Sequence, residues 1–390
     1  MTSTFKISDN KDEKCRVGTL EIGEKSYLTP SFMLYTKEGS PINLTKDLLN
    51  QLPHEKTHSL QLLFSDLFQF TDVLEKFEQG VHKFLALQDH LLFLLIRDSS
   101  SFVEAEFNDD SISVTTRKGK TKITIQDYIK LVKVIKPDFV TSLSVDIAWE
   151  TSKKKATKIV NSSSIWLEKF LEANTGINTF GVIQGGKFED LRMKSLQDLL
   201  KNKDRLVGTI LSGFGTGETN EERNQLINKL IDQLPKEHVK LISGVGSPEE
   251  ILSLVELGID LFSTNYPNLM TEWGNALTFK YKMNELKNND NQEENKINLW
   301  DSKFVIDATP IIKGCECFTC IQHTKAYIHH LLNTHEMLAE VLLTIHNVSH
   351  YLGFFEEIRR VIKDSQFSEY KKLFLEKRIQ INNNSNSNDN

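Results

Sequence analysis

The sequence predicts an α/β protein in which a (β/α)8 barrel is followed by a metal-binding region near the C-terminus. Three observations support this. Apolar runs of strand length alternate with amphipathic segments about eight times, polar residues fall where several of these runs end, and three of the four cysteines lie within six residues of one another. Alternating strands and helices indicate a parallel sheet, and about eight repeats favour a closed barrel. A doubly wound open sheet is the alternative.

The predicted strands come first, because they define the barrel. They are Thr29–Thr36, Ser59–Phe64, Leu92–Asp98, Phe139–Asp146, Phe180–Gly186, Val207–Gly213, Val239–Gly246 and Leu261–Tyr266. The intervening segments carry apolar residues at helical spacing. Examples are Ile125–Ile135, Ser164–Ala173, Glu189–Leu200, Glu222–Leu234 and Pro248–Leu257.

Length and composition describe a globular protein without a basic character. The 390 residues suit one large barrel or two ordinary domains, and 39% are hydrophobic and 26% charged. Because the net charge is −6, a nucleic acid would have to be held by a local patch or by a partner protein. The first fourteen residues are polar, and the longest apolar run, His90–Ile96, is too short to cross a bilayer. We therefore expect no transmembrane segment and a cytoplasmic location.

Changes in composition suggest four regions. Residues 1–283 hold the barrel, and residues 284–298 form a polar Asn/Glu/Lys loop. Residues 299–378 form the metal-binding subdomain and the C-terminal helices, which we expect to pack on the barrel. Residues 379–390 are a low-complexity polar tail that cannot bury a core and is predicted to be disordered.

The cysteine cluster predicts a structural zinc site. Cys315, Cys317 and Cys320 form a C-x-C-x-x-C motif, and several histidines follow. Zinc accepts three thiolates and one imidazole in a tetrahedron, and four protein ligands leave no position for a reactive water. The alternatives are three cysteines packed as small hydrophobes, or disulfides, which an odd number of clustered thiols in a cytosolic setting disfavours.

Helix geometry selects the fourth ligand from His323, His329, His330, His335, His346 and His350. A helix over Ile321–Leu332 would advance about 18 Å at 1.5 Å per residue. Asn333 and Glu336 resemble a capping box that starts a second helix. If this helix runs antiparallel, it returns to the level of the cysteines at His346.

Polar side chains and glycines at the strand ends predict a site at the C-terminal face of the barrel, where barrel enzymes place their active sites. These residues are Asp98, Asp146, Gln184, Gly213, Gly246 and Ser263. The alternative is that strand ends are polar simply because loops begin there.

Several motifs together resemble the queuine/archaeosine tRNA-ribosyltransferase family, also called tRNA-guanine transglycosylases. The motifs are Thr29–Met33, Asp98–Ser99, Gly181–Gly185, Ser212–Phe214 with Gly217–Glu218, Gly244–Glu249, and the cysteine cluster with a histidine 26 positions after Cys320. The resemblance implies an irregular TIM barrel with a zinc subdomain. It also implies a reaction in which a carboxylate attacks the ribose C1′ while guanine in tRNA is exchanged for a deazaguanine base.

The resemblance also implies roles for single residues. Asp98 matches the acid/base aspartate and Ser99 the serine that follows it. Asp146 matches a base-recognising aspartate, and Gln184 and Gly213 match base-contacting residues. Ser263 stands where catalytic members carry the nucleophilic aspartate, and a serine without an adjacent base is a poor nucleophile. We therefore predict no catalytic residue of this kind in the chain.

Two further departures agree with a loss of catalysis. Ser100 and Ser101 replace paired glycines after Asp98–Ser99, and Pro267–Leu269 lacks the threonine and arginine that face tRNA in catalytic members. Asp260 has an odd offset from Ser263 on the strand, so it should point to the opposite face and be structural.

The resemblance therefore implies a non-catalytic, accessory member that forms a heterodimer with a catalytic homologue and serves queuine exchange at the wobble position of tRNA. It implies an interface that includes Phe318 in the zinc region, a homodimer in the partner's absence, and association with the mitochondrial outer membrane. Two alternatives stay open at this point: an active transglycosylase with an unusual nucleophile, and a scaffold that binds queuine without chemistry.

Overall fold

The computed structural model describes residues 3–8, 14–53, 56–98, 100, 102–116, 119–288 and 294–387. The chain divides into two compact units. The barrel unit comprises Met1–Pro41 and Thr57–Asn265, and the C-terminal unit comprises Ile42–Lys56 and Tyr266–Asn390. This division does not coincide with the boundary expected after residue 283, because α10 (Tyr266–Glu272) and β15 (Asn275–Leu277) pack against the long helix α14 (Met337–Lys363).

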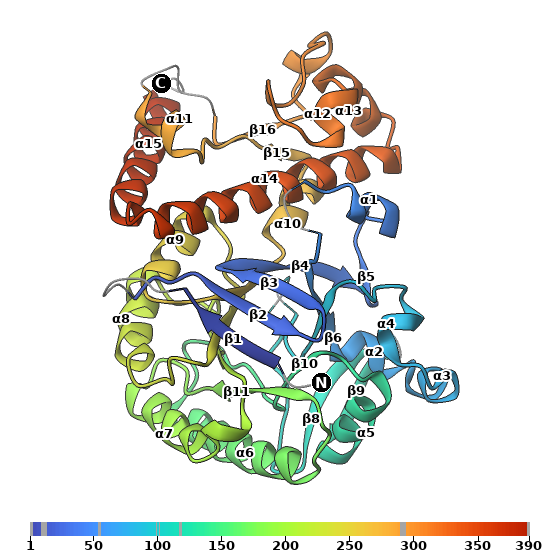
Figure 1. Ribbon diagram of the computed structural model, residues 1–390, viewed down its shortest axis with the longest axis vertical. Helices are drawn as coiled ribbons and strands as arrows, with labels where there is room; N and C mark the ends of the chain where they lie inside the picture. Colours follow the sequence, from blue (N-terminus) through green and yellow to red (C-terminus); the bar gives the residue numbers. More distant parts are fainter. Residues whose placement is uncertain are drawn as a thin grey trace. The chain divides into compact units, whose positions relative to one another are not determined.

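Eight parallel strands close into a ring in the barrel unit (Figure 1). They are β4 (Ser31–Lys37), β6 (Ser59–Leu63), β7 (Leu91–Leu95), β10 (Phe139–Thr141), β11 (Asn178–Ile183), β12 (Gly208–Leu211), β13 (Val239–Ser243) and β14 (Leu261–Ser263). Each strand lies beside the next in this order, and the pairing of β14 with β4 completes the ring. The closed ring confirms the predicted barrel and excludes the open sheet.

Each observed strand overlaps one of the apolar runs that predicted it, but most end earlier. β10 ends at Thr141, for example, whereas the predicted run continues to Asp146. The residues that follow each strand form loops at the same end of the barrel, since parallel strands bring their C-terminal ends together. The polar residues at the predicted strand ends therefore lie in these loops or at the last strand position.

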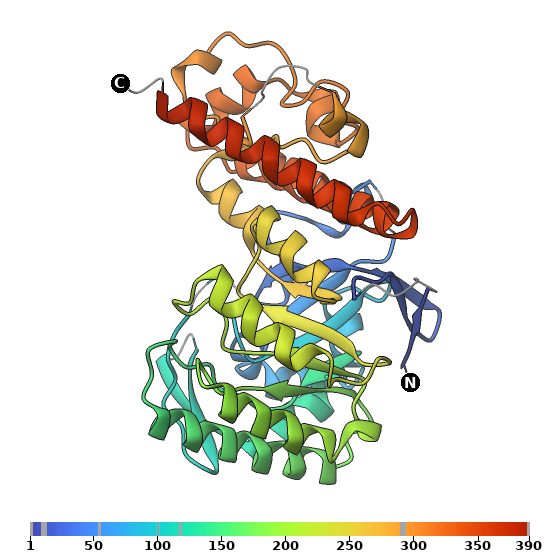
Figure 2. The ribbon, with the colours of Figure 1, turned by 90° about the vertical axis from the view of Figure 1, so that its left-hand side faces the viewer.

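Helices surround the barrel. Five follow β9 to β13: α5 (Ile125–Ile135), α6 (Lys153–Glu172), α7 (Glu189–Leu200), α8 (Asn220–Ile231) and α9 (Pro248–Glu256). Neighbouring members contact one another, and Figure 2 shows the green helices side by side on the outside. Their starts have sequence causes: Thr124 and Ser247 accept backbone N–H groups in capping boxes, and Pro248 occupies the first turn of α9.

Shorter elements complete the barrel unit. They are β5 (Ser40–Pro41), α2 (Phe64–Phe68), α3 (Thr71–Phe77), α4 (Gly80–Phe84), the hairpin of β8 (Ser111–Thr116) and β9 (Gly119–Thr124), and a 3-10 helix at Lys203–Arg205. Segments between β4 and β7 thus replace regular barrel helices, which makes the barrel irregular.

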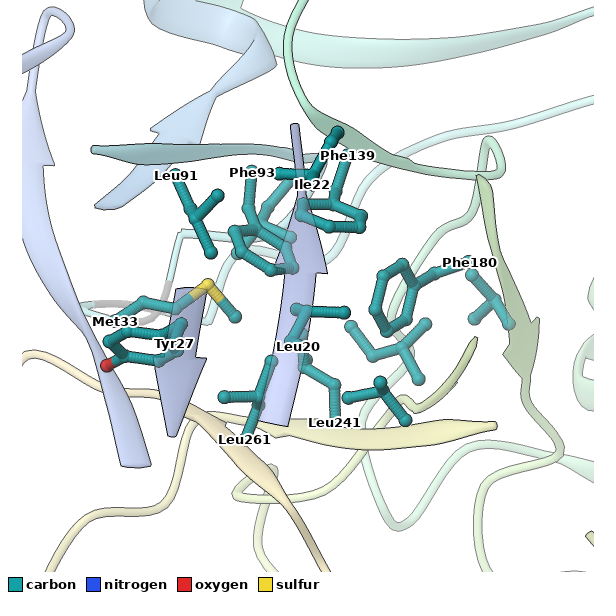
Figure 3. Packing of buried hydrophobic residues seen from close by; sticks show 14 residues of the cluster. Leu20, Ile22, Tyr27, Met33, Leu91, Phe93, Phe139, Phe180, Leu241 and Leu261 are labelled. Carbon is teal, nitrogen blue, oxygen red and sulfur yellow. The ribbon is translucent and has the colours of Figure 1, made fainter. Parts of the chain in front are cut away.

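A three-stranded antiparallel sheet packs on the apolar interior of the barrel. Its strands are β1 (Ser3–Ile7), β2 (Gly18–Ile22) and β3 (Lys25–Thr29). Leu20, Ile22 and Tyr27 join one buried cluster with residues that include Phe93 and Phe139 (Figure 3). Since Leu91, Phe139, Val239 and Leu261 begin their strands, the sheet covers the N-terminal end of the barrel and leaves the C-terminal end for the polar loops.

The C-terminal unit is mainly helical. Its other elements are α1 (Lys46–Asn50), α11 (Met283–Lys287), β16 (Lys296–Asn298), a 3-10 helix at Ser302–Phe304, α12 (Phe318–Gln322), α13 (Lys325–Asn333) and α15 (Phe367–Ser387). No helix in the described part of the chain is both long and apolar enough to cross a membrane.

Two segments of this unit that were expected to be irregular, the polar loop and the C-terminal tail, contain helix or strand. α11 and β16 occupy the two ends of the segment expected to be a polar loop, and residues 289–293 between them lie outside the described residues. The backbone of α15 continues to Ser387, into the segment expected to be a disordered tail from residue 379.

Candidate metal centre and barrel mouth

The predicted metal ligands converge in the C-terminal unit. Cys315, Cys317, Cys320 and His346 each offer a donor atom, and these atoms all lie within 4.8 Å of one another. Cys315 precedes α12, Cys317 is the N-cap of α12, and Cys320 lies inside it. His346 reaches the cluster from α14 and is fully buried.

The structure places His346 beside the cysteines, as the helix geometry predicted, but the helices on which that prediction relied are partly wrong. The expected helix over Ile321–Leu332 is interrupted at His323, whose backbone is extended, and α13 starts anew with Thr324 as its N-cap. The capping box expected at Asn333 is also wrong: Asn333 ends α13, and α14 starts after Glu336 without a side-chain cap.

The four donors fit a tetrahedral ion. Nδ1 of His346 lies 3.4 Å from Sγ of Cys320 and 3.6 Å from Sγ of Cys317. Zinc bonds of about 2.3 Å to sulfur and about 2.05 Å to nitrogen give an expected N–S edge of about 3.5 Å. These two distances are therefore those expected of a tetrahedral site that could hold a metal ion.

The imidazole is oriented for metal binding by its other nitrogen. Nε2 of His346 lies 2.8 Å from the carbonyl oxygen of Leu277, so Nε2–H donates and the Nδ1 lone pair faces the sulfurs. Although burial acts to lower the pKa of His346, the neighbouring Cys315 and Cys320 raise it to about 10. The sulfurs thus favour a positive charge at Nδ1, which either a proton or a metal ion bound through the Nδ1 lone pair could supply.

Asn347, the next residue of α14, fixes the strand that carries Leu277. Its Oδ1 accepts the Leu277 N–H at 2.8 Å, and its Nδ2 donates to the carbonyl of Asn275 at 2.9 Å and to Oγ1 of Thr271 at 3.0 Å. Since buried polar groups must be paired, these bonds hold β15 on α14 and place the Leu277 carbonyl beside His346.

At the barrel mouth, Asp98 is held by its neighbours. Its carboxylate accepts the Tyr35 hydroxyl at 3.0 Å and 3.3 Å and the backbone N–H of Ser100 at 2.7 Å. Burial and the Asp98 charge raise the pKa of Tyr35, so the phenol stays a hydrogen-bond donor. Ser99 and Ser101 lie outside the described residues.

Asp146 is paired with an arginine that the sequence analysis did not single out. Nη1 of Arg97 lies 2.8 Å from Oδ2 of Asp146, and the two side chains are 12% and 6% exposed. The Ser212 hydroxyl donates to the other carboxylate oxygen. Both oxygens of Asp146 therefore contact groups of this chain.

Gln184 is likewise satisfied. Its Nε2 donates to the carbonyl of Val145 at 2.7 Å, and its Oε1 accepts the Ser163 hydroxyl. Gly213 adopts a left-handed φ of 72°, and its carbonyl accepts Nη2 of Arg192 at 3.4 Å. The structure thus brings the predicted residues to one end of the barrel but joins each to a different neighbour.

Arg192 is a second arginine that sequence reasoning missed. It extends from α7, is fully buried, and donates to the carbonyls of Gly186 at 2.7 Å and Ser212 at 3.0 Å. Its guanidinium lies 4.0 Å from the ring centre of Phe214. Burial lowers its pKa to about 10, although Asp146 and Glu218 act in the opposite direction. Arg192 lies in an amphipathic helix without a recognisable motif, so the sequence gave no indication that it reaches the barrel mouth.

Ser263, at the end of β14, is fully buried and donates to Oε1 of Gln61 at 2.7 Å. Nε2 of Gln61 donates in turn to the carbonyls of Thr264 at 2.9 Å and Met33 at 3.2 Å. The hydroxyl is therefore tied into the barrel wall through a glutamine on β6. A polar residue in the middle of an apolar strand was the one available signal for Gln61.

Asp260 points away from the mouth, as its odd offset predicted. Its carboxylate accepts Nε and Nη2 of Arg16 at 2.8 Å and 2.6 Å, and neither side chain reaches the surface appreciably. The pair joins the segment before β2 to the start of β14, so Asp260 is structural.

Together, the closed parallel barrel and the Cys3His cluster define the class: a TIM-barrel protein with a separate metal-binding region. The family model for queuine tRNA-ribosyltransferase matches residues 11–380, and the chain belongs to this family.

Close relatives carry one name, "Queuine tRNA-ribosyltransferase accessory subunit 2". The Homo sapiens protein is 34% identical over 92% of this chain and 96% of its own length. The Danio rerio protein is 32% identical over 93% and 97%, and the Aedes aegypti protein is 30% identical over 94% and 91%. These names agree with a non-catalytic partner subunit.

Proposed function

We propose that this chain is the non-catalytic accessory subunit of a queuine tRNA-ribosyltransferase. In this proposal it pairs with a catalytic homologue that exchanges guanine for queuine at the wobble position of tRNA. The observation that carries the proposal is Ser263: a buried hydroxyl bonded to Gln61 at the strand end where catalytic members of the family carry their nucleophile. The names of the relatives support the same conclusion.

The chemistry explains why Ser263 is decisive. A nucleophile that displaces a base from ribose must present a free, basic atom to C1′. The Ser263 hydroxyl proton is committed to a neutral amide oxygen, which cannot remove it. Asp98 remains at the mouth, but an acid/base group without a nucleophile cannot form the covalent intermediate. The partner must therefore supply the attacking carboxylate.

We propose that the metal is one structural Zn2+ held by Cys315, Cys317, Cys320 and His346. Four protein ligands complete its coordination, so it would cross-link α12 to α14 without activating water. Thr319 supports the same junction, because its hydroxyl donates to the carbonyl of Leu342 at 2.7 Å.

The partner surface in this proposal includes the outer faces of α12 and α13. Phe318, Ile321 and Tyr327 are 37%, 62% and 38% exposed. The His323 ring lies 5.7 Å from that of Phe318 and 5.2 Å from that of Tyr327. Such an exposed apolar and aromatic group is typical of protein interfaces. The same surface would support a homodimer when the catalytic chain is absent.

Contact with tRNA is proposed to occur through the complex. The cytoplasmic location, with association at the mitochondrial outer membrane, stays a prediction.

Co-purification with the catalytic homologue tests the proposal. We expect a stable 1:1 complex that exchanges the base, whereas this chain alone gives no turnover. Phe318→Asp should weaken the complex, because it buries a charge in the interface. A matched exposed change in the barrel unit, Val73→Asp, should leave the complex intact. Full activity of the catalytic chain without this one would overturn the accessory role.

The alternatives give different results in the same assays. An active enzyme with an unusual nucleophile would exchange the base on its own, and Ser263→Ala would abolish that activity. A queuine-binding scaffold would bind the free base in calorimetry. Neither alternative is favoured, since Ser263, Asp146 and Gln184 are all bonded to groups of this chain.

A further inference from the structure

Arg97 extends across the mouth of the barrel. It follows β7, and its Nη1 donates to the carbonyl of Phe214 at 2.6 Å while Nη2 donates to that of Gly215 at 3.4 Å. Both carbonyls follow β12, and β10 and β11 separate β12 from β7 in the ring. The side chain therefore bridges loops that are not neighbours.

The glycine after the opposite strand confirms this path. Three strands separate β13 from β7 in either direction around the ring. Gly244 directly follows β13, and a Cβ at this position would collide with Nη2 of Arg97. Gly244 also has a φ of +83°, which favours glycine. The guanidinium thus packs on the backbone of the far side of the mouth.

Three hydrogen-bond acceptors lie close to the guanidinium. Asp146 contributes a carboxylate oxygen 2.8 Å from Nη1, and Phe214 and Gly215 contribute carbonyls. A guanidinium is a planar array of N–H donors, and a carboxylate is its usual partner. Since a buried charge must be paired, the set is suited to a planar cation.

Arg97 itself fills this set incompletely. Its Nε is buried and has no hydrogen-bond partner among the described residues, and Oδ2 of Asp146, although it lies 2.8 Å from Nη1, likewise accepts no hydrogen bond from them. The side chain is tethered at Cα, so it cannot rotate to use this donor without losing its contacts through the two Nη atoms. A free guanidinium ion has no tether and can offer all of its N–H groups.

We propose that the barrel mouth holds a binding site for planar guanidinium-type cations and that Arg97 is its built-in occupant. The acceptors of Asp146, Phe214 and Gly215 form the site, and Gly244 supplies the space. Removing the side chain beyond Cβ frees the site for an external cation of the same chemistry. This inference does not depend on the partner named in the proposed function.

Chemical rescue tests the inference. The full-length chain carrying Arg97→Ala is heated in low millimolar guanidinium chloride and, in parallel, in equal sodium chloride. We expect a saturable rise in Tm of about 2–4 °C with guanidinium alone, because a ligand that binds only the folded state stabilises it. The unaltered chain should show no rise, since Arg97 occupies the site.

Two matched variants make the test specific. Arg205→Ala also removes a guanidinium, which donates to the carbonyl of Leu171 at 2.6 Å and has no carboxylate partner among the residues that the structure describes. This variant should show no rescue. Adding Asp146→Ala to Arg97→Ala should abolish the rise. The inference is overturned if guanidinium raises the Tm of Arg97→Ala no more than that of Arg205→Ala. It is equally overturned if Arg97→Ala cannot be recovered folded in either salt.

Discussion

The metal cluster and the barrel mouth are both sets of polar residues that the sequence singled out, yet they differ in what their atoms face. In the cluster, three sulfurs and Nδ1 of His346 face one another. At the mouth, the predicted residues face other groups of the chain: Asp98 faces Tyr35, Asp146 faces Arg97, and Ser263 faces Gln61. Convergent donors indicate a ligand, whereas internally paired donors indicate a scaffold.

This difference distinguishes a site arranged to bind a metal ion from a pocket that is not arranged for catalysis. A metal site requires donor atoms around one centre, and a change in any ligand disrupts it. A catalytic pocket must leave acceptors free for substrate, and a buried polar group that loses its substrate must find another partner. The hydrogen bonds and ion pair at the barrel mouth are of the kind expected for polar groups that are paired within the chain and bind no substrate.

The largest effect is expected when one of the four predicted metal ligands is removed. Cys320→Ser should reduce bound zinc from one ion per chain to a small fraction and cost more than about 5 kcal/mol in the C-terminal unit, because zinc binding contributes directly to folding. Elemental analysis and thermal unfolding measure this. Cys15→Ser is the matched control: Cys15 is buried in the barrel unit, outside the cluster, so it should retain full zinc.

A smaller loss of stability is expected when a carboxylate is introduced at position 263 in the barrel mouth. Ser263→Asp should lose about 3 kcal/mol of stability, because the new carboxylate meets Oε1 of Gln61, whose Nε2 is already committed to two carbonyls. Urea unfolding checks the loss. Base exchange by this variant alone should stay absent, and turnover would show that the missing aspartate was the only defect.

Asn347→Ala should cost about 2 kcal/mol, since it removes three hydrogen bonds and leaves the Leu277 N–H unpaired. Zinc content should remain at one ion, because no ligand is lost. A parallel loss of zinc would mean that the position of β15 controls His346.

Ser263→Ala should have the smallest effect, a loss of about 1 kcal/mol for one hydrogen bond. Activity of the assembled complex should not change. Reduced activity in a complex of unchanged stability would place Ser263 in the chemistry.

The sequence predicted much of the architecture because its signals are local. Each barrel strand is an apolar run, and α5 and α7 follow the predicted ranges. The clustering of Cys315, Cys317 and Cys320 was predictable because cysteine spacing within a short segment is itself the signal. The break at His323 was not, since it depends on Thr324 capping a new helix.

The internal pairing at the mouth could not be predicted from sequence. Arg97 contacts a residue 117 positions away, and Ser263 contacts one 202 positions away. Contacts between residues so far apart in sequence depend on which strands lie opposite or beside each other in the closed ring. Alternation of strands and helices indicates a barrel but does not say which side chains cross it.

The most direct test of the central claim uses the assembled complex with the partner's nucleophilic aspartate replaced by asparagine. If this chain has no nucleophile, base exchange into tRNA should fall to the uncatalysed level while the complex stays intact and retains its zinc. Residual exchange that disappears on adding Ser263→Ala to this chain would contradict the account.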